Sequence, residues 1–169
     1  GDPGYKFDDE FFLLNPNING THYILSAVKK FSPKSRFYFA GSSEMFGNSI
    51  DKDGFQRLST SMNPVSPYGC SKVMGYDLVR HYRHAYKLHA CNGILFNHES
   101  PRRGSNFVTN KVVKAACSIK LGLQDCLYLG NLNALRDWGH AKDYVEAQWL
   151  MLQQKKPLDL VIATGKQSS

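Results

Sequence analysis

The sequence predicts an α/β fold in which a doubly wound, mostly parallel sheet carries helices on both faces. Short apolar runs of strand length alternate along the chain with longer segments that have helical spacing. No internal repeat and no low-complexity linker interrupts this alternation. Strands that alternate with helices favour parallel pairing, because a parallel connection needs a crossover long enough to hold a helix.

The first three predicted elements have local signals at their ends. Residues 15–30 suit a helix that ends in lysines, whose charge is favourable at a helix C-terminus. The run RFYFAGSS at 36–43 is apolar and closed by small residues, which is typical of a buried strand. After a long loop, Ser66 suits an N-cap and Pro67 suits the first position of a helix.

Five further elements are expected in the second half of the chain: a strand at 89–97, a helix at 106–122, a short strand at 126–130, a helix at 141–154 and a strand at 158–164. Gly122 is the stop signal of the helix at 106–122, since glycine suits the left-handed position after a helix. Asp143 falls in the first turn of the helix at 141–154, where negative charge is favourable.

Composition and charge exclude several classes of protein. The 169 residues, 42% hydrophobic and 12% aromatic, suffice for a globular core. A net charge of +7 suits anionic partners, but the basic residues are scattered rather than gathered into a stripe, so we expect no nucleic acid partner. No apolar run has the length of a membrane span, and the opening GDPGYKFDDE lacks the pattern of a signal sequence. We therefore expect a cytoplasmic protein with no membrane contact.

Two kinds of motif are absent from the sequence: cysteine and histidine motifs that bind metals, and glycine-rich motifs that bind phosphate. The four cysteines include no Cys-x-x-Cys pair and no His-Glu-x-x-His motif occurs, so we expect reduced thiols and no metal site. No G-x-G-x-x-G turn follows a strand, and no G-x-x-x-x-G-K-[ST] loop occurs. The first residues lead directly into a helix, whereas such a fold normally opens with a strand. We therefore expect a fold that is incomplete at its N-terminus.

Tyr68 and Lys72 lie four residues apart in the helix predicted after Ser66, so they share one helix face. The first turn of a helix favours negative charge, and an ammonium one turn later does the same. Both effects are expected to lower the pKa of the Tyr68 phenol, so that it can act as a base near neutral pH. The ordinary alternative, in which the two side chains only pack or face water, stays open at this point.

Ser42 and Glu44 follow the predicted strand at its C-terminal end, where open α/β sheets bind ligands. If extended geometry persists, the two side chains project from the same side of the chain. A hydroxyl and a carboxylate would then share one crevice. An exposed, serine-rich turn is the alternative.

Four stretches of the chain together carry a resemblance: GSSEMFG, the Tyr68-x-x-x-Lys72 pair, CNGILFNHESPRRG and LYLGNLNALRDWGHAKDYVEAQWLMLQ. They resemble the GDP-mannose 4,6-dehydratase family of extended short-chain dehydrogenases/reductases. Tyr-x-x-x-Lys alone marks only the superfamily, whereas the two long stretches are more particular. The resemblance runs from about Phe37 to Thr164, and residues 1–14 resemble the family poorly. It implies that residues 1–169 form part of a single Rossmann-like NAD(P)-binding domain, with substrate-binding elements around 97–136.

The resemblance implies a reaction of GDP-mannose in three steps. NADP+ takes a hydride from carbon 4, water leaves across carbons 5 and 6, and the hydride returns to carbon 6. Tyr68 would remove the hydroxyl proton at carbon 4, while Lys72 keeps the phenol ionised and holds the nicotinamide ribose. Glu44 would abstract the carbon 5 proton and then protonate the departing hydroxyl. Ser42 stands where the family typically has threonine, and it keeps the hydroxyl that hydrogen-bonds at carbon 4.

The resemblance also implies binding roles for six residues: His98 and Arg103 for the dinucleotide, Asn97 for the substrate, Arg136 for the nucleotide diphosphate, and Lys111 with Asn131 for the GDP side. The residues themselves leave ordinary alternatives open. Arg103 could lie in a solvated turn, and Asn97 could be satisfied at a strand end. Arg136 could pair with Asp137 or Asp143 at the surface.

Three functions stay open on the sequence. The first is the dehydratase, and the second is another sugar-nucleotide epimerase or reductase of the extended family, which needs no carboxylate such as Glu44. The third is a chain that acts only as a fold fragment or interaction partner. The missing glycine turn favours the third, since the helix N-terminus after that turn supplies much of a dinucleotide's binding energy. We expect weak or no NADP binding by this chain alone, and a homo-oligomer for full-length family members.

Overall fold

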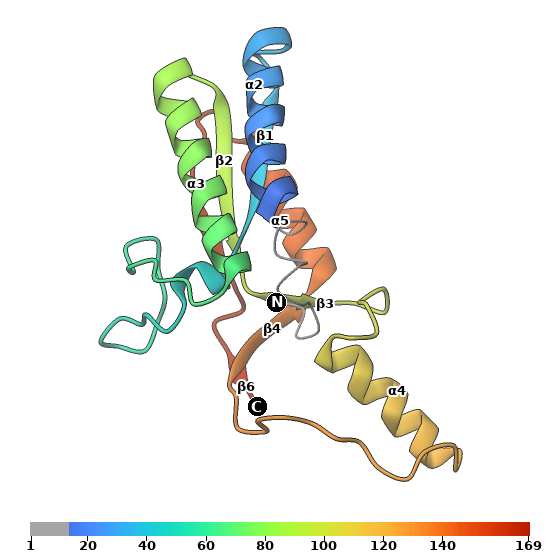
Figure 1. Cartoon of the computed structure of the whole chain (residues 1–169). Helices are drawn as coiled ribbons and strands as arrows, with labels where there is room; N and C mark the ends of the chain where they lie inside the picture. Colours follow the sequence, from blue (N-terminus) through green and yellow to red (C-terminus); the bar gives the residue numbers. More distant parts are fainter. Residues whose placement is uncertain (1–13) are drawn as a thin grey trace.

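The computed structural model describes residues 14–169, and Figure 1 shows their arrangement. The helical elements are the π-helical turn η2 (Pro16–Gly20), α2 (Thr21–Phe31), the 3-10 turn η3 (Ser43–Phe46), α3 (Pro67–Tyr86), α4 (Val108–Lys120) and α5 (Ala141–Gln153). The strands are β1 (Arg36–Ser42), β2 (His89–Leu95), β3 (Asn97–Glu99), β4 (Arg136–His140), β5 (Leu160–Ile162) and β6 (Gln167–Ser168).

The strands form two small sheets. The first has the order β1-β2-β5 and is parallel throughout, with Arg36 of β1 opposite His89 of β2 and Ser42 opposite Leu95. The second has the order β3-β4-β6, in which β3 and β4 are parallel and β6 is antiparallel to β4. The predicted α/β class with a mostly parallel sheet is confirmed.

Helices cover both faces of the first sheet, as a doubly wound fold requires. Phe39 of β1 turns toward α3, where a Cβ on Gly75 would lie only 2.3 Å from the Phe39 ring. Glycine at this position therefore allows helix and strand to approach closely. Arg36 lies on the other side of the pleat and donates a hydrogen bond to the Leu152 carbonyl of α5. Figure 1 shows α2 and α3 side by side on one face, with α5 behind the sheet.

The hydrophobic core lies between the first sheet and the α2–α3 pair. Its buried members are Leu25, Phe39, Met45, Phe46, Tyr76, Val79, Tyr82, Leu88, Ala90 and Ile94. Met45 and Phe46 belong to η3, and both are fully enclosed. Burying side chains of this size contributes about 1.5–3 kcal/mol each. The turn that follows β1 is therefore anchored in the core.

The structure departs from the predicted elements in three places. The strand expected at 126–130 is wrong, because residues 121–135 form an exposed return from α4 to β4 in which no segment pairs with a neighbour. The strand expected at 89–97 ends at Leu95; the Phe96 N–H still donates to the Ile162 carbonyl at 3.0 Å, and the chain then enters the second sheet as β3. Strand β4 was not predicted, since its five residues RDWGH carry no clear alternation.

The remaining predicted elements are present. The helix at 15–30 corresponds to η2 and α2, and the strand at 158–164 contains β5. Helix α4 is followed by Gly122 with a φ of 70°, the left-handed conformation expected of a helix stop. The expectation that a strand is missing before the first helix concerns residues that lie outside the described part of the chain. Within residues 14–169, no helix combines the length and apolar character needed to cross a membrane.

Candidate active site

The end of β1 and the start of α3 meet in what we call the β1–α3 junction, which consists of Ser42, Glu44, Ser66, Tyr68 and Lys72. Ser42 keeps the extended backbone of the strand, with φ −140° and ψ 146°, and the chain then turns into η3. The expected continuation of strand geometry to Glu44 is therefore wrong. The Ser42 hydroxyl instead accepts a hydrogen bond from the Glu44 backbone N–H at 3.3 Å, while buried Met45 and Phe46 hold the turn against the core.

Ser66 joins the two parts of the junction. It is the N-cap of α3 as predicted, and its hydroxyl accepts a hydrogen bond from the Gly69 N–H at 3.0 Å. The same hydroxyl donates to Glu44 Oε2 at 3.0 Å. Glycine at position 69 allows this approach, because a Cβ there would lie 2.8 Å from the Glu44 carbonyl oxygen. The turn η3 and the helix α3 therefore contact each other in two ways, through the Ser66–Glu44 hydrogen bond and through the close approach of the two backbones at Gly69.

Tyr68 and Lys72 lie on one face of α3, as their spacing predicts. Lys72 Nζ is 5.4 Å from the centre of the Tyr68 ring and 5.2 Å from the centre of the Phe39 ring. Both side chains are half-buried. The two residues therefore do not simply face water, whereas the alternative in which they only pack stays open.

The pKa of Tyr68 is raised, which is opposite to the direction expected from the sequence. Burial of the phenol is the largest cause and the negative charge of Glu44 adds to it, while a hydrogen bond with Ser42 and the charge of Arg103 offset part of the rise. The expectation was wrong because it counted the helix and Lys72 but neither burial nor Glu44. Burial also lowers the pKa of Lys72. Phenol, hydroxyl and carboxylate therefore interact within one site.

Asn97 and His98 begin β3 beside the junction. Asn97 is half-buried and lies opposite Trp138 of β4. His98 Nδ1 donates to the Phe96 carbonyl at 2.8 Å, since a carbonyl oxygen can only accept. Its ring stacks on that of Tyr144, with centres 4.9 Å apart and planes 22° apart. The His98 ring is therefore fixed by a hydrogen bond at one edge and by an aromatic face.

Arg103 is held in place rather than lying in a solvated turn. Its Nε is 3.2 Å from Glu99 Oε2, an ion pair that lacks the alignment of a hydrogen bond. Its guanidinium carbon lies 3.5 Å from the centre of the Phe107 ring, which is the geometry of a cation–π contact. Glu99 is itself fixed by a hydrogen bond from the Thr109 hydroxyl at 2.6 Å. Because the charge of Arg103 also lowers the pKa of Tyr68 in part, this side chain is electrostatically coupled to the junction.

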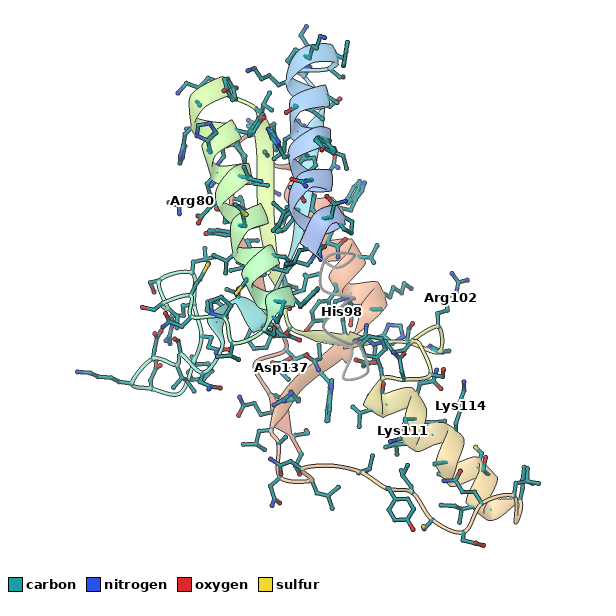
Figure 2. All side chains as sticks on the ribbon, in the orientation of Figure 1. Arg80, His98, Arg102, Lys111, Lys114 and Asp137 are labelled. Atoms are coloured by element: carbon teal, nitrogen blue, oxygen red, sulfur yellow. The ribbon has the colours of Figure 1, made fainter. Side chains whose placement is uncertain are left out.

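Lys111 and Asn131 lie on what we call the α4 arm, which consists of α4 and residues 121–135. Lys111 Nζ donates to the Tyr128 carbonyl at 3.1 Å, and Asn131 Oδ1 accepts from the Asn133 N–H at 2.9 Å. Both side chains are exposed. Figure 2 shows Lys111 on α4, apart from His98 on β3 and Asp137 on β4. The structure therefore does not bring these two residues to the junction.

Arg136 begins β4 with an exposed side chain, whose Nη1 donates to the preceding backbone carbonyl at 2.9 Å. In the described part of the chain it forms no ion pair, so the surface pair with Asp137 or Asp143 is absent. Asp137 is buried, and its carboxylate accepts hydrogen bonds from the backbone N–H groups of Thr164 at 3.0 Å and Gly165 at 2.8 Å. The guanidinium of Arg136 is therefore available to a ligand.

One contact of the junction could not be found from the sequence. Ser66 suits an N-cap by its position before Pro67, but its hydrogen bond to Glu44 spans 22 residues and leaves no local signal. Among residues 14–169, no three metal-ligating side chains gather into a group that could hold a metal ion.

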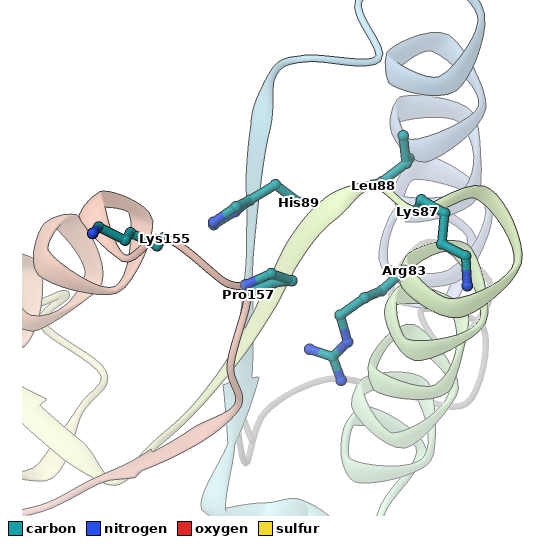
Figure 3. A pocket seen from close by; sticks show the side chains of 6 residues that line it. All are labelled: Arg83, Lys87, Leu88, His89, Lys155 and Pro157. Atoms are coloured by element: carbon teal, nitrogen blue, oxygen red, sulfur yellow. The ribbon is translucent and has the colours of Figure 1, made fainter.

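A shallow pocket lies elsewhere in the molecule, and Figure 3 shows the side chains that line it: Arg83, Lys87, Leu88, His89, Lys155 and Pro157. It lies at the amino end of β2, whereas the junction lies beside the carboxyl end of β1. Arg83 is already engaged there by Asp159, through two hydrogen bonds of 2.7 Å. Ligands of open α/β sheets bind at the carboxyl ends of strands, so the junction is the better candidate for an active site.

Comparison with known families supports the expected resemblance. The family model for GDP-mannose 4,6 dehydratase matches residues 4–169, so the likeness begins well before Phe37, and the expectation that residues 1–14 depart from the family is wrong over most of that range. A GDP-mannose 4,6-dehydratase of Yersinia enterocolitica is 51% identical over 164 residues, covering 96% of this chain and 44% of the relative. The human GDP-mannose 4,6 dehydratase is 52% identical over 163 residues, covering 95% of this chain and 43% of the relative. The chain spans less than half the length of these curated relatives.

Solved structures share the fold at lower sequence identity. RMD from Pseudomonas aeruginosa, complexed with NADPH, gives a TM-score of 0.87 at 22% identity, covering 96% of this chain and 55% of that chain. A dTDP-glucose 4,6-dehydratase from Bacillus anthracis, in complex with NAD, gives a TM-score of 0.79 at 26% identity, covering 90% of this chain and 48% of that chain. The arrangement of β1, α3 and their neighbours is thus one that nicotinamide-binding proteins use.

Proposed function

The chain belongs to the GDP-mannose 4,6-dehydratase family, and we propose that it supplies the catalytic side chains for converting GDP-mannose to GDP-4-keto-6-deoxymannose. The observation that carries the proposal is the β1–α3 junction, where a hydroxyl, a carboxylate, a phenol and an ammonium gather at one end of the first sheet. Each of these groups matches one demand of an oxidation followed by loss of water.

Tyr68 and Ser42 serve the first step. As a base, Tyr68 takes the hydroxyl proton at carbon 4, and Ser42 hydrogen-bonds the oxygen that becomes a ketone. Ser42 acts to lower the pKa of the Tyr68 phenol, which supports this pairing. Because burial and Glu44 raise the pKa of the phenol, Tyr68 must release its own proton before it can act as this base, and the positive charge of Arg103 favours that release.

Glu44 serves the elimination. A ketone at carbon 4 acidifies the proton at carbon 5, and a carboxylate close to Tyr68 is suited to abstract it and then to protonate the departing hydroxyl at carbon 6. A simple dehydrogenase, epimerase or reductase needs no such second group. The hydrogen bond of 3.0 Å from Ser66, two residues before Tyr68, to Glu44 Oε2 supports the required proximity of the carboxylate to the phenol.

We further propose NADP as the cofactor, held by Tyr68, Lys72, His98 and Arg103. The donor set fits, since Lys72 is a half-buried ammonium that forms no ion pair within residues 14–169, and ammonium and guanidinium groups suit ribose hydroxyls and phosphate. When bound, the nicotinamide accepts and returns the hydride. Asn97, Lys111, Asn131 and Arg136 are proposed contacts of GDP-mannose. Of these, the exposed guanidinium of Arg136, which forms no ion pair within residues 14–169, best suits a diphosphate.

The setting of the enzyme is part of the same proposal. We place the reaction in the cytoplasm, where a reducing environment agrees with four free cysteines. We expect the family-length protein to be a homo-oligomer. The alternative function, a fold fragment or interaction partner without activity of its own, is decided by the experiment below.

The test is incubation with GDP-mannose and NADP+, followed by mass analysis of the sugar nucleotide. It is run on the 169-residue chain and on a chimaeric protein in which this chain replaces the matching segment of the Yersinia relative. Loss of one water by the chimaeric protein supports the dehydratase, because all five junction side chains then come from this chain. If the chimaeric protein is active but the 169-residue chain is inactive and binds NADP with a dissociation constant above the micromolar range, the short chain by itself lacks affinity for the cofactor. If the correctly folded chimaeric protein is also inactive, the proposed function is wrong.

A further inference from the structure

The Ser66 hydroxyl lies between the turn η3, which carries Glu44, and the helix α3, which carries Tyr68. It donates to Glu44 Oε2 at 3.0 Å and accepts from the Gly69 N–H at 3.0 Å. A hydroxyl has one proton to donate, and an ionised carboxylate can only accept, so the direction of both hydrogen bonds is fixed. One side chain therefore bonds to the turn that carries Glu44 and to the helix that carries Tyr68.

We propose that Ser66 is a positioning residue for Glu44, which holds the carboxylate beside Tyr68 for the elimination step. The inference rests on the proposed function, because positioning matters only if Glu44 and Tyr68 act on one sugar. Ser66 itself is assigned no contact with substrate or cofactor. Its role is to fix the spacing between two groups that do the chemistry.

The backbone around Ser66 is suited to this role. Its φ of −137° and ψ of 152° are extended, and Pro67 follows with a ring that fixes its own φ, so the Ser66 Cβ direction is tightly set relative to the first turn of α3. Tyr68 lies two residues later in that turn. A shift of the Ser66 side chain relative to Tyr68 is therefore restricted by the backbone between them.

The close approach of η3 to α3 is a second observation that Glu44 is held against the N-terminus of α3. A Cβ on Gly69 would lie 2.8 Å from the Glu44 carbonyl oxygen and 3.3 Å from Ser66 Oγ. Only glycine leaves room for the three groups at these distances. The backbone of Glu44 and its carboxylate are thus both set against the N-terminus of α3, the first through Gly69 and the second through Ser66.

An N-cap alone does not require the contact with Glu44. A capping hydroxyl needs only to accept from a backbone N–H, which Ser66 does through Gly69. The donated hydrogen bond to the carboxylate is additional, and the two roles can be separated by substitution. Ser66→Gly removes the hydroxyl but weakens the cap less than Ser66→Ala does, whereas Ser66→Thr retains a hydroxyl for both bonds.

The test measures the pKa of Tyr68 by NMR titration of the unliganded 169-residue chain, with the ring carbon next to the phenolic oxygen labelled. It needs neither substrate nor activity, so it succeeds or fails separately from the proposed function. The chain is compared with Ser66→Ala, Ser66→Gly, Ser66→Thr and Glu44→Gln, and with the double variant Ser66→Ala/Glu44→Gln. Two variants without the hydroxyl are used so that failure of one to fold leaves the other.

If Ser66 holds Glu44 beside Tyr68, its loss lets the carboxylate move toward water. We then expect the pKa of Tyr68 to shift downward in Ser66→Ala and Ser66→Gly, and to stay in place in Ser66→Thr. In the Glu44→Gln background, Ser66→Ala should produce no further shift. An unchanged pKa of Tyr68 in Ser66→Ala and Ser66→Gly would overturn the proposal. An equal shift with and without Glu44 would also overturn it, because fraying of the first helical turn would then be the cause.

Discussion

The β1–α3 junction and the α4 arm differ in what holds their functional side chains. At the junction, Glu44 is bonded to Ser66 across 22 residues of sequence, and the turn that carries it is anchored by fully buried Met45 and Phe46. On the arm, Lys111 reaches only a carbonyl of the same segment, and Asn131 closes a turn on itself. The fold therefore holds the proposed catalytic side chains of the junction through contacts between distant segments. The arm side chains proposed to bind the nucleotide are oriented only by contacts within the arm.

The two regions also differ in how far their side chains are exposed to solvent. Leu123 and Tyr128 of the arm are 77% and 83% exposed, whereas Met45, in the turn that carries Glu44, is fully buried. Figure 1 shows α4 standing away from the first sheet, with residues 121–135 running back to β4. Substitutions at the junction should therefore affect rate or folding strongly, and substitutions on the arm should affect folding little.

The largest effect is expected from Glu44→Gln. Loss of a general acid or base lowers a rate by about 10²–10⁴-fold. In the chimaeric protein, loss of water from GDP-mannose should fall by this factor, as measured by mass analysis over time. Glu146→Gln on the exposed side of α5 is the control and should keep the rate. A Glu44→Gln protein that still forms product at the original rate would remove the carboxylate from the mechanism.

A large loss of stability is expected from Asp159→Asn. Asp159 is mostly buried, binds Arg83 through two hydrogen bonds and accepts the Asn92 N–H at 2.9 Å, which ties the start of β5 to β2. Leaving one charge of such a pair unpaired costs about 3–5 kcal/mol. Urea unfolding should show this loss.

The matched control for this substitution is Asp77→Asn. Asp77 is exposed and pairs with Arg80 at 3.5 Å, a contact of the kind that contributes about 1 kcal/mol or less. Equal losses of stability in the two variants would contradict the idea that the buried Arg83–Asp159 pair stabilises the first sheet more than an exposed ion pair does.

The stability of the fold should fall as pH rises above about 10. Burial raises the pKa of Tyr38 and Tyr68, and burial followed by the charges of Asp137 and Asp143 raises that of Tyr144 to about 12. The folded protein keeps these protons where the unfolded chain loses them, so folding stability declines from about pH 10 toward pH 12. Urea midpoints at pH 8, 10 and 11 measure the decline.

Two substitutions separate the groups responsible for this decline. Tyr144→Phe should make the fall of the urea midpoint shallower, because it removes one proton that only the folded state retains. Tyr128→Phe, on the exposed arm, should leave the fall as it is. A fall that is unaffected by Tyr144→Phe would show that this phenol does not contribute.

The smallest effect on folding is expected from Lys111→Ala. Lys111 is exposed and makes one hydrogen bond of 3.1 Å, and surface substitutions of this kind usually change stability by less than about 0.5 kcal/mol. If Lys111 contacts the nucleotide as proposed, KM for GDP-mannose should rise in the chimaeric protein while kcat stays near its original value. A loss of stability comparable to that of Asp159→Asn would break the distinction between arm and junction.

The residues of the junction can be predicted from local signals in the sequence. Ser66 and Pro67 marked the start of α3, and the four-residue spacing of Tyr68 and Lys72 placed them on one face. Each of these signals acts within one turn of helix, where geometry is fixed by the backbone alone. The strand ending at Ser42 could be predicted for the same reason, because an apolar run closed by small residues is a local pattern.

What could not be predicted depends on distant contacts. The turn η3 replaces extended geometry because Met45 and Phe46 find a core built from α2, α3 and β2, which the local sequence does not encode. The pKa of Tyr68 rises because burial and Glu44, brought close by that turn, outweigh the influence of the helix. The run at 126–130 has strand-like residues but no partner, and a strand requires one.

The most direct test of the dehydratase assignment follows a deuterium label placed on carbon 4 of GDP-mannose. The chimaeric protein is incubated with this substrate and NADP+, and the product is examined by NMR. Transfer of the label to carbon 6 of a product that has lost one water is the result expected for oxidation, elimination and reduction at one site. A label that stays on carbon 4, or a product that retains all its oxygen atoms, would contradict the account and favour an epimerase or reductase.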